Sequence, residues 1–315
     1  MKNKPLSPPQ IIVLSFLSVI LLGTILLSLP ISTAGDGRLG VVDSLFTATS
    51  ATCVTGLVVK DTGSYFSGFG KGVILLLMQV GGLGIMTFST MFAILLGRKL
   101  SISQNIMVQS ALDHSRIDGL KKLVLYIVLF TVTIEAIGAA LLFFRWKLVY
   151  GWGSLFAFKQ AVFHAVSAFC NAGFSMFTNS MTGFRGDNIS MVIVSTLIIL
   201  GGIGFVVLLD FRKVKFLGKG RAYFLSKISL QTKIAVLVTA VLIILGALGF
   251  LLFERNGLLA GMPGKEKLWS CLFTSITSRT AGFNVIQTGA LRPVTLFMIT
   301  LLMFVGASPG STGGG

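Results

Sequence analysis

The chain has 315 residues, of which 54% are hydrophobic and only 11% are charged. A single soluble core cannot bury that much apolar surface, so the composition excludes an ordinary soluble domain and predicts an all-α protein that crosses a membrane several times. A formal net charge of +16 would favour nucleic acid as the partner of a soluble protein, but here the distribution of charge between loops indicates membrane topology.

Six apolar segments are predicted to be membrane-spanning helices. The first, Ile11–Pro30, carries no charge, and the roughly 20 residues that it spans suffice to cross a hydrocarbon layer about 30 Å thick. It is longer than the apolar core of a signal peptide, which favours a retained helix over cleavage near Gly35. The other segments lie near Gly72–Leu96, Leu123–Phe144, Ser190–Leu209, Ile234–Phe253 and Val294–Val305.

A polar window with a shared pattern follows the first, third and fifth segments, at residues 43–59, 160–176 and 270–286. Each window begins with an aliphatic residue and a phenylalanine and continues through small and hydroxyl-bearing residues. Each ends in a glycine followed by a large apolar residue, at Gly56, Gly173 and Gly282. Because such self-similarity indicates repeats, we divide the chain into three helix, half-helix and helix units at 1–98, 99–211 and 212–315.

The start of each window is predicted to be a half-helix that enters the membrane from outside. A helix of about 11 residues reaches roughly 16 Å, which is about half of the hydrocarbon layer. The chain must then return in an extended form through Val54, Thr55 and Gly56, through Asn171, Ala172 and Gly173, and through Thr280, Ala281 and Gly282. Glycine allows successive carbonyls to turn the same way, and rings of carbonyls can replace the hydration shell of an alkali cation. The negative C-terminal end of a half-helix adds to the attraction, so no charged side chain is needed.

The segment after each window carries clustered glycines. Gly81-Gly82-x-Gly84 and Gly201-Gly202-x-Gly204 are typical of close packing between membrane helices. The third counterpart is interrupted by Pro309 and small or polar residues, and irregular backbone at that depth is tolerated only where it is buried in protein or lines water. We therefore predict a pore-lining loop made of Gly306, Ala307, Ser308, Pro309, Gly310, Ser311, Thr312 and Gly313, in a stretch that runs on to Gly315.

The loops Arg98–Lys122 and Arg212–Lys233 are short and strongly basic. An N-terminus on the inside, with Lys2 and Lys4, places both loops on the cytoplasmic side, as the positive-inside rule requires. The basic residues can serve topology and contact with anionic lipid, or they can form a docking surface for a cytosolic partner. The sequence leaves both interpretations open.

Catalytic and metal-binding patterns are not found in the sequence. Cys53, Cys170 and Cys271 lack the spacing of a metal site or a disulfide framework, and His114 and His164 fall in different compartments. No pair of a nucleophile and a base can be assembled from these residues. We therefore expect neither an enzyme nor a cofactor in this chain.

The motifs TATSATCVTGL (47–57), NAGF (171–174), RTAGF (279–283) and GASPGSTGGG (306–315) resemble those of the KtrB and TrkH type of membrane subunit. These subunits belong to a superfamily of bacterial, fungal and plant potassium transporters. QVGGLGIMTF (79–88) and GGIGF (201–205) extend the similarity over nearly the whole chain. The resemblance implies potassium transport, with some sodium permeability, through a channel-like pore in the bacterial cytoplasmic membrane.

The resemblance also implies a selectivity filter of four segments with one central glycine each, so the three triplets around Gly56, Gly173 and Gly282 are the expected K⁺ ligands. It implies a gate in the Gly306–Gly315 loop and a homodimer on a cytosolic ring of nucleotide-binding regulatory subunits of the KtrA and TrkA type. The family has a fourth repeat that these 315 residues do not show, so we do not expect them to conduct ions alone.

A secondary carrier with discontinuous helices is the alternative function, and it would require ionisable residues at mid-membrane. Glu135 alone qualifies among the acids of the spanning segments. Arg279, next to the third filter triplet, needs a partner because a bare cation would repel the transported ion. We favour a structural pair of Arg279 with Glu135, Asp43 or Glu254 over proton coupling through Glu135. His164 is expected to be a hydrogen-bonded core residue, and Cys53 and Cys170 to pack behind the filter.

Overall fold

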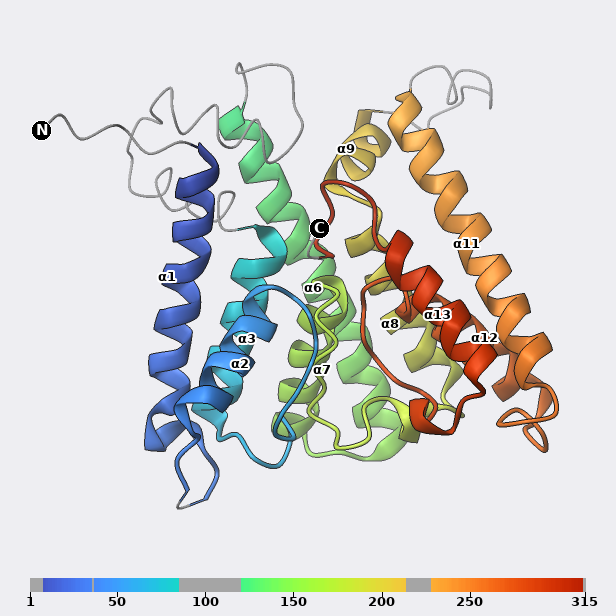
Figure 1. Cartoon of the computed structure of the whole chain (residues 1–315), viewed down its shortest axis with the longest axis horizontal. Helices are drawn as coiled ribbons and strands as arrows, with labels where there is room; N and C mark the ends of the chain where they lie inside the picture. Colours follow the sequence, from blue (N-terminus) through green and yellow to red (C-terminus); the bar gives the residue numbers. More distant parts are fainter. Residues whose placement is uncertain (1–7, 36, 85–119, 214–227, 314–315) are drawn as a thin grey trace, which may run out of the picture.

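The computed structural model describes residues 8–35, 37–84, 120–213 and 228–313, and these are almost entirely helical, with no named strand among them (Figure 1). The longer helices are α1 (Pro8–Ser28), α3 (Gly68–Leu83), α6 (Leu120–Tyr150), α8 (Asn188–Gly202), α11 (Leu230–Glu254) and α13 (Pro293–Val305). The shorter ones are α2 (Val41–Thr52), α7 (Ser154–Phe169), α9 (Phe205–Lys213) and α12 (Gly264–Thr277), with 3₁₀ turns at Pro30–Ser32, Thr182–Phe184 and Thr288–Ala290.

Each predicted membrane segment overlaps one of the longer helices. In the described part of the chain, Val124–Tyr150 and Leu230–Glu254 are long and apolar enough to cross a membrane, and the apolar stretches of α1, α3, α8 and α13 are shorter. Many of their leucines, isoleucines and phenylalanines are exposed, which suits a surface that faces lipid rather than water. The predicted extension of the second segment to Leu96 lies outside the described residues.

The segment predicted as one helix over Ser190–Leu209 is broken, which corrects that prediction. α8 ends at Gly202 and α9 starts at Phe205, because Gly204 has a φ of +97° that an α-helix cannot accommodate. The amide of Phe205 donates to the carbonyl of Gly310, 2.9 Å away, instead of to a carbonyl of its own helix. Gly204 therefore interrupts the helix, and the loop that contains Gly310 binds at the interruption.

The short helices α2, α7 and α12 occupy equivalent places. Each packs against the long helix before it, namely α1, α6 or α11. α2 and α7 also pack against the helix that follows them, α3 or α8. Between units, α3 contacts α7 in the same way that α8 contacts α12. The three short helices thus share the packing on the preceding long helix, while the division into three units at 1–98, 99–211 and 212–315 stays a prediction.

Small side chains allow the short helices to lie deep in the structure. Ser44, Thr47, Ala48, Ser50 and Ala51 are all buried in α2. Small residues at a helix interface let backbones approach closely, which replaces the hydrophobic drive that is absent between helices in lipid. As a result the last residue of α2, Thr52, is buried, and its carbonyl lies against Gly81 of α3.

An ion pair links α6 to the start of α8. The Nη2 atom of Arg145 lies 2.8 Å from Oδ1 of Asp187, and the same carboxylate accepts from the amides of Ile189 and Ser190 at the start of α8. Burial raises the pKa of the Asp187 carboxyl, but the hydrogen bonds of Arg145 and Ser190 and the charge of Arg145 bring it below its ordinary value. The nearby indole of Trp146 donates to Ser190 Oγ at 2.9 Å.

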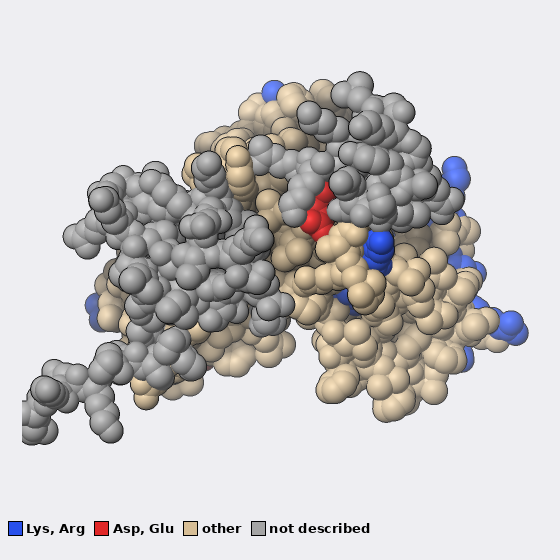
Figure 2. All heavy atoms as spheres, turned by 90° about the horizontal axis from the view of Figure 1, so that it is seen from above, with Lys and Arg blue, Asp and Glu red and all other residues tan. Residues whose placement is uncertain are grey.

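The two basic loops fall largely outside the described residues, which omit 85–119 and 214–227. Figure 2 views the end of the molecule at which α9 and the first turns of α6 and α11 lie. On the described surface of this end, Lys and Arg side chains are visible mainly toward the margin and acidic ones form a small area near the middle.

Candidate cation-binding site

Three short stretches, Val54–Gly56, Asn171–Gly173 and Thr280–Gly282, follow the ends of α2, α7 and α12; we refer to them as the glycine segments. Their backbones share one pattern. The first residue of each is left-handed, with φ of 56° at Val54, 55° at Asn171 and 76° at Thr280. The last residue is left-handed as well, with φ of 79° at Gly56, 70° at Gly173 and 78° at Gly282.

This alternation of left-handed and ordinary backbone has a direct consequence for the carbonyls. In an ordinary extended chain successive carbonyls point in opposite directions, but alternating positive and negative φ can turn them to one side. Left-handed conformations at non-glycine residues are uncommon, and for a β-branched residue such as Val54 or Thr280 they are outliers. Their occurrence at the same place in three segments shows that these segments share one backbone conformation.

The glycine segments approach one another closely. A Cβ atom added to Gly56 would lie 2.7 Å from the carbonyl oxygen of Ala172, and one added to Gly173 would lie 2.8 Å from that of Ala281. A Cβ on Gly282 would lie 3.1 Å from the Cα of Gly173. The predicted site residues therefore do come together, with the second segment between the first and the third.

A cavity of about 290 Å³, which we call the mouth cavity, opens onto all three glycines. Its other lining residues are mainly polar, and they include Ser175, Thr178, Asn179, Asn284 and the acidic Asp61. Asp61 Oδ1 accepts hydrogen bonds from the amide and the hydroxyl of Ser64, so this carboxylate is held in place. The mouth cavity is therefore a polar space next to the three glycines.

The C-terminal ends of α2, α7 and α12 lie directly before the glycine segments. The last carbonyls of a helix carry partial negative charge, equivalent to about half an elementary charge, and so favour a cation nearby. The two cysteines at the ends of α2 and α7 differ. Cys170 is buried against Gly82, where an added Cβ would lie 2.7 Å from its Sγ, whereas Cys53 is exposed. The expectation of packing therefore holds for Cys170 and is wrong for Cys53.

The loop Gly306–Gly313 inserts between the broken ends of α8 and α9. The amide of Ser308 donates to Gly202 O at 2.9 Å, and the amide of Thr312 donates to Gly201 O at 3.2 Å. The buried hydroxyl of Thr312 donates to Phe169 O at 2.6 Å, in the last turn of α7. The loop also approaches the third glycine segment, since a Cβ atom added to Gly313 would lie 2.7 Å from Thr280 Oγ1. None of its residues lines the mouth cavity.

Arg279 and Glu135 do not meet, so the predicted pairing is corrected. The Nε atom of Arg279, a residue 9% exposed, donates to the carbonyl of Gly306 at 3.1 Å. Glu135, 8% exposed, instead faces the thiol of Cys170, whose Sγ lies 3.8 Å from Oε1. Glu254 accepts from Thr295 Oγ1 at 2.7 Å and from the amide of Arg292 at the start of α13. Among the described residues Arg279 forms no ion pair with these acids or with Asp43.

His164 behaves as the hydrogen-bonded core residue that was expected. Its Nδ1 donates to the carbonyl of Gln160 at 2.8 Å, and its Nε2 lies 3.0 Å from the hydroxyl of Ser175. The ring stacks on Phe177 at a centroid distance of 4.4 Å. Ser175 follows the second glycine segment closely, so His164 supports the wall of the mouth cavity.

Sequence reasoning missed a set of hydroxyls behind the glycine segments. Ser50, Ser167 and Thr277 donate from their side chains to the carbonyls of Leu57, Phe174 and Phe283, which directly follow the three glycines. The alignment of the windows already places a hydroxyl residue at these positions. It could not show which atom each hydroxyl reaches, because that depends on how the chain returns after the helix.

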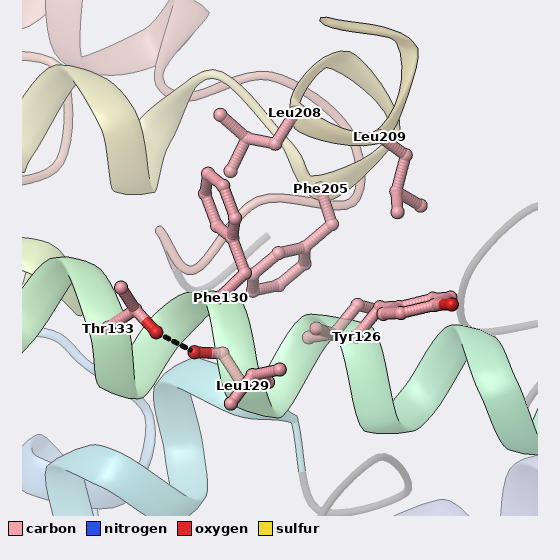
Figure 3. Close-up of a pocket in the computed structure, with 8 residues that line it drawn as sticks. Tyr126, Leu129, Phe130, Thr133, Phe205, Leu208 and Leu209 are labelled. Carbon is pink, nitrogen blue, oxygen red and sulfur yellow. Dashed lines mark hydrogen bonds between the residues drawn. The ribbon is translucent and has the colours of Figure 1, made fainter. Parts of the chain in front are cut away.

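A further cavity of about 210 Å³ lies between α6 and α9 (Figure 3). No residue of the glycine segments lines it. It is lined by Tyr126, Ile127, Leu129, Phe130, Thr133, Phe205, Leu208 and Leu209. The hydroxyl of Thr133 is bonded to the carbonyl of Leu129, so the cavity presents an almost wholly apolar wall. The described residues also contain no cluster of three or more His, Cys, Asp or Glu side chains that could hold a metal ion.

Comparison with known proteins gives a consistent result. A family model described as TrkH, cation transport protein, matches residues 7–315. The Ktr system potassium uptake protein B of Bacillus subtilis is 41% identical over 312 residues, covering 98% of this chain and 67% of that protein. The potassium/sodium uptake protein NtpJ of Enterococcus hirae is 38% identical over 317 residues, covering 99% of this chain and 67% of the relative. The chain therefore spans about two thirds of the length of these relatives.

A solved structure shows the same fold. The crystal structure of the potassium transporter TrkH from Vibrio parahaemolyticus matches with a TM-score of 0.67 at 20% identity, over 99% of this chain and 59% of that chain. This confirms the predicted class of a polytopic, all-α membrane protein. The matched family and relatives are described as transport proteins rather than as enzymes, in agreement with the expectation from the sequence.

Proposed function

The chain belongs to the TrkH family of cation transport proteins, and we propose that it is a pore-forming subunit for potassium uptake across the bacterial cytoplasmic membrane. The observation that carries the proposal is the left-handed, ordinary, left-handed backbone of Val54–Gly56, Asn171–Gly173 and Thr280–Gly282. This pattern would line up carbonyl oxygens at the ends of α2, α7 and α12, next to the polar mouth cavity. Such an arrangement suits a dehydrated alkali cation and offers little to an anion or an organic solute.

In the proposed mechanism the glycine segments form the selectivity filter. A cation enters the mouth cavity hydrated, and the carbonyl oxygens then replace the water molecules of its hydration shell. The partial negative charge at the ends of α2, α7 and α12 offsets part of the cost of losing that water. The resemblance implies a ring of four segments, of which three come from the residues described here. A K⁺ ion held in this way is the transported substrate and not a cofactor.

The loop Gly306–Gly313 is the proposed gate. In the proposed arrangement it lies on the inner side of the glycine segments, where it contacts Arg279 and the end of α7, so that a cation leaving them would pass it. Its contacts with α8 and α7 are made largely through backbone groups and the single hydroxyl of Thr312. A handful of hydrogen bonds of this kind contributes only about 1 kcal/mol each, so the loop can be released without unfolding the helices.

The proposed assembly is a homodimer on a cytosolic ring of nucleotide-binding subunits of the KtrA or TrkA type. The relative from Bacillus subtilis is named as a protein of the Ktr system, which supports work within a system of several components. With the N-terminus inside, the basic loops Arg98–Lys122 and Arg212–Lys233 would face such a ring. The nucleotide would bind the partner, not this chain.

Uptake measurements test the proposed function. The complete gene is expressed in a bacterium that lacks its own potassium uptake systems, and initial rates of K⁺ and Na⁺ entry are measured with and without the gene for the cytosolic partner. We expect K⁺ entry above that of cells with an empty vector, and a preference for K⁺ over Na⁺. Entry of neither ion, in cells whose membranes contain the protein and its partner, would contradict the proposal. Uptake that requires a proton gradient but no potential would favour a coupled carrier.

A further inference from the structure

The three hydroxyls behind the glycine segments make the same bond. The Oγ atom of Ser50 donates to the carbonyl of Leu57 at 2.7 Å, and that of Ser167 donates to Phe174 O at 2.6 Å. The Oγ1 atom of Thr277 donates to Phe283 O at 2.9 Å. In each case the acceptor is the carbonyl of the residue that follows the glycine.

The backbone of the same three residues holds the other side of the glycine. The carbonyl of Ser50 accepts from the amide of Thr55 at 2.8 Å, and that of Ser167 accepts from the amide of Ala172 at 2.8 Å. The carbonyl of Thr277 accepts from the amide of Ala281 at 2.9 Å. These amides belong to the residues that precede the glycines. One hydroxyl residue in each short helix therefore forms hydrogen bonds with the residues on both sides of the glycine.

The third helix keeps the bond although its window is one residue shorter. Ser50 and Ser167 lie six positions before their glycines, whereas Thr277 lies five positions before Gly282. A bond that arose only from helix geometry and chance would be lost when the spacing changes. Its presence in all three places indicates that the position of the carbonyl, and not the spacing, is what the structure maintains.

Burial makes these bonds matter for the carbonyls. Ser50, Ser167 and Thr277 are all buried, so water does not compete for their hydroxyls. A carbonyl that loses its donor in such a place either stays unsatisfied, which is costly, or rotates to find another partner. In the proposed filter, the partner nearest to such a freed carbonyl would be the transported cation.

We propose that Ser50, Ser167 and Thr277 are positioning residues that determine how many carbonyls face the transported cation, and thereby set the preference for K⁺ over Na⁺. The inference rests on the proposed function. Each hydroxyl holds the carbonyl after the glycine away from the pore, so the row of ligands stops at the glycine. Selectivity between alkali cations depends on the number and the spacing of such ligands, which makes the hydroxyl a determinant of selectivity without touching the ion.

The chain offers matched controls on the same helices. Ser44 in α2 and Ser270 in α12 are fully buried, and their hydroxyls have no hydrogen-bond partner in the described structure. Ser44→Ala and Ser270→Ala thus remove the same atom from the same helices without freeing a carbonyl of the glycine segments. Conservative variants that keep a hydroxyl, Ser50→Thr and Thr277→Ser, serve as rescues.

The test measures K⁺ and Na⁺ entry in the same cells and compares the ratio of the two rates, because this ratio does not depend on how much protein reaches the membrane. We expect Ser50→Ala, Ser167→Ala and Thr277→Val to lower the K⁺ to Na⁺ ratio by about fivefold each, the factor that corresponds to one ordinary net hydrogen bond. Ser44→Ala, Ser270→Ala and the two rescue variants should keep the original ratio. Thr277→Val preserves the side-chain shape and therefore separates loss of the bond from loss of the fold.

Two results would overturn the inference. An unchanged ratio in Ser167→Ala and Thr277→Val, in a protein that still carries K⁺, would show that the hydroxyls do not determine selectivity. An equal fall of the K⁺ to Na⁺ ratio in Ser44→Ala would show that the effect arises from helix packing instead. Failure of the unmodified protein to carry K⁺ is a different result, because it rejects the proposed function and the inference together.

Discussion

At the scale of single residues, each glycine segment has a positive φ at its glycine, which the sequence predicts, and another at its first residue, which the sequence does not predict. Gly56, Gly173 and Gly282 could be predicted, because glycine is the residue that adopts a positive φ without cost. The positive φ of Val54 and Thr280 could not, since β-branched residues strongly disfavour it. Such strain costs about 1–3 kcal/mol for each residue and persists only where the surroundings determine the backbone. Here the surroundings are the end of the short helix and the neighbouring glycine segment.

We predict that Gly56→Ala lowers both K⁺ uptake and the preference for K⁺ over Na⁺. The new Cβ would be strained at a φ of +79° and would lie 2.7 Å from the carbonyl oxygen of Ala172. Gly151→Ala is the matched control, because Gly151 also has a positive φ, of 65°, but has nothing near its Cβ position. Initial rates of K⁺ and Na⁺ entry distinguish the two. If both variants behaved alike, backbone strain alone and not crowding of the carbonyls would be responsible.

Partner choice among the charged residues is the part of the site that sequence reasoning got wrong. The expectation joined Arg279 to an acid because a bare cation beside the filter would repel the transported ion, yet the guanidinium bonds to the carbonyl of Gly306. Which groups meet depends on the depth and direction of each side chain, and these follow from helix packing rather than from residue type. The shorter of the two ion pairs among the described residues, between Arg145 and Asp187, involves residues that the sequence did not single out.

We predict that Asp187→Asn lowers the stability of the folded protein by about 2 kcal/mol at pH 7, as expected for loss of hydrogen bonds to a charged group. Because the folded pKa of Asp187 lies below its ordinary value of 3.8, its contribution is present above pH 3.8 and is lost as the pH falls through the folded pKa. Thermal unfolding in detergent at neutral and acid pH measures this difference.

Glu266→Gln is the control for this experiment. Its pair with Arg185 is 3.6 Å long, and both side chains are about one third exposed, so it contributes little at any pH. An Asp187→Asn effect that persisted unchanged at acid pH would contradict the electrostatic explanation. It would then have to arise from the altered cap of α8.

At the scale of elements, the clustered glycines have two functions that look alike in the sequence. Gly81 and Gly201 allow α3 and α8 to approach the ends of α2 and α7, since an added Cβ would overlap the carbonyl of Thr52 or Phe169. Gly204 instead breaks the helix and exposes a turn against which Pro309 and Gly310 lie. The periodicity of apolar residues continues through Gly204, which is why a single helix was predicted there.

We predict that Gly81→Ala lowers the amount of folded protein in the membrane and destabilises it by about 1–3 kcal/mol or more, as overpacking does in a dense core. The atom that would have to move is backbone of α2, so relaxation is difficult. Gly72→Ala on the same helix α3 meets nothing within 4 Å and should be neutral or slightly stabilising. Membrane content and the midpoint of thermal unfolding report both effects, and equal behaviour of the two variants would refute the packing interpretation.

The position of the gate loop leads to a further prediction. Thr312→Val removes the hydroxyl bond to Phe169 that holds the loop under the glycine segments, and deletion of 308–312 removes the loop contacts altogether. We expect K⁺ flux to rise with Thr312→Val and to rise further with the deletion. Thr300→Val is the control, because its hydroxyl bonds only to Leu296 in its own helix. Flux that stays the same or falls in the deletion variant would count against gating by this loop.

At the scale of the whole molecule, the sequence predicted the helical class and an apolar helix at each of six places, one of which, Ser190–Leu209, is broken at Gly204. These features depend on apolar length and on repetition, which are visible without coordinates. The meeting of the glycine segments was implied by the family resemblance alone. The sequence pattern does not show how closely one glycine segment approaches the next, because this follows from the way α3 packs on α7 and α8 on α12. The basic loops and their proposed ring-facing role remain predictions, since most of their residues lie outside the described part.

The most direct measurement is to locate the bound cation. Crystals of the complete protein grown in Rb⁺, which substitutes for K⁺ in size and charge, allow the ion to be placed by anomalous scattering. We predict a peak on the axis between Gly56, Gly173 and Gly282, within bonding distance of the carbonyls of the glycine segments and weakened when Na⁺ replaces Rb⁺. A peak beside a carboxylate such as Glu135, with none at the glycine segments, would contradict the account.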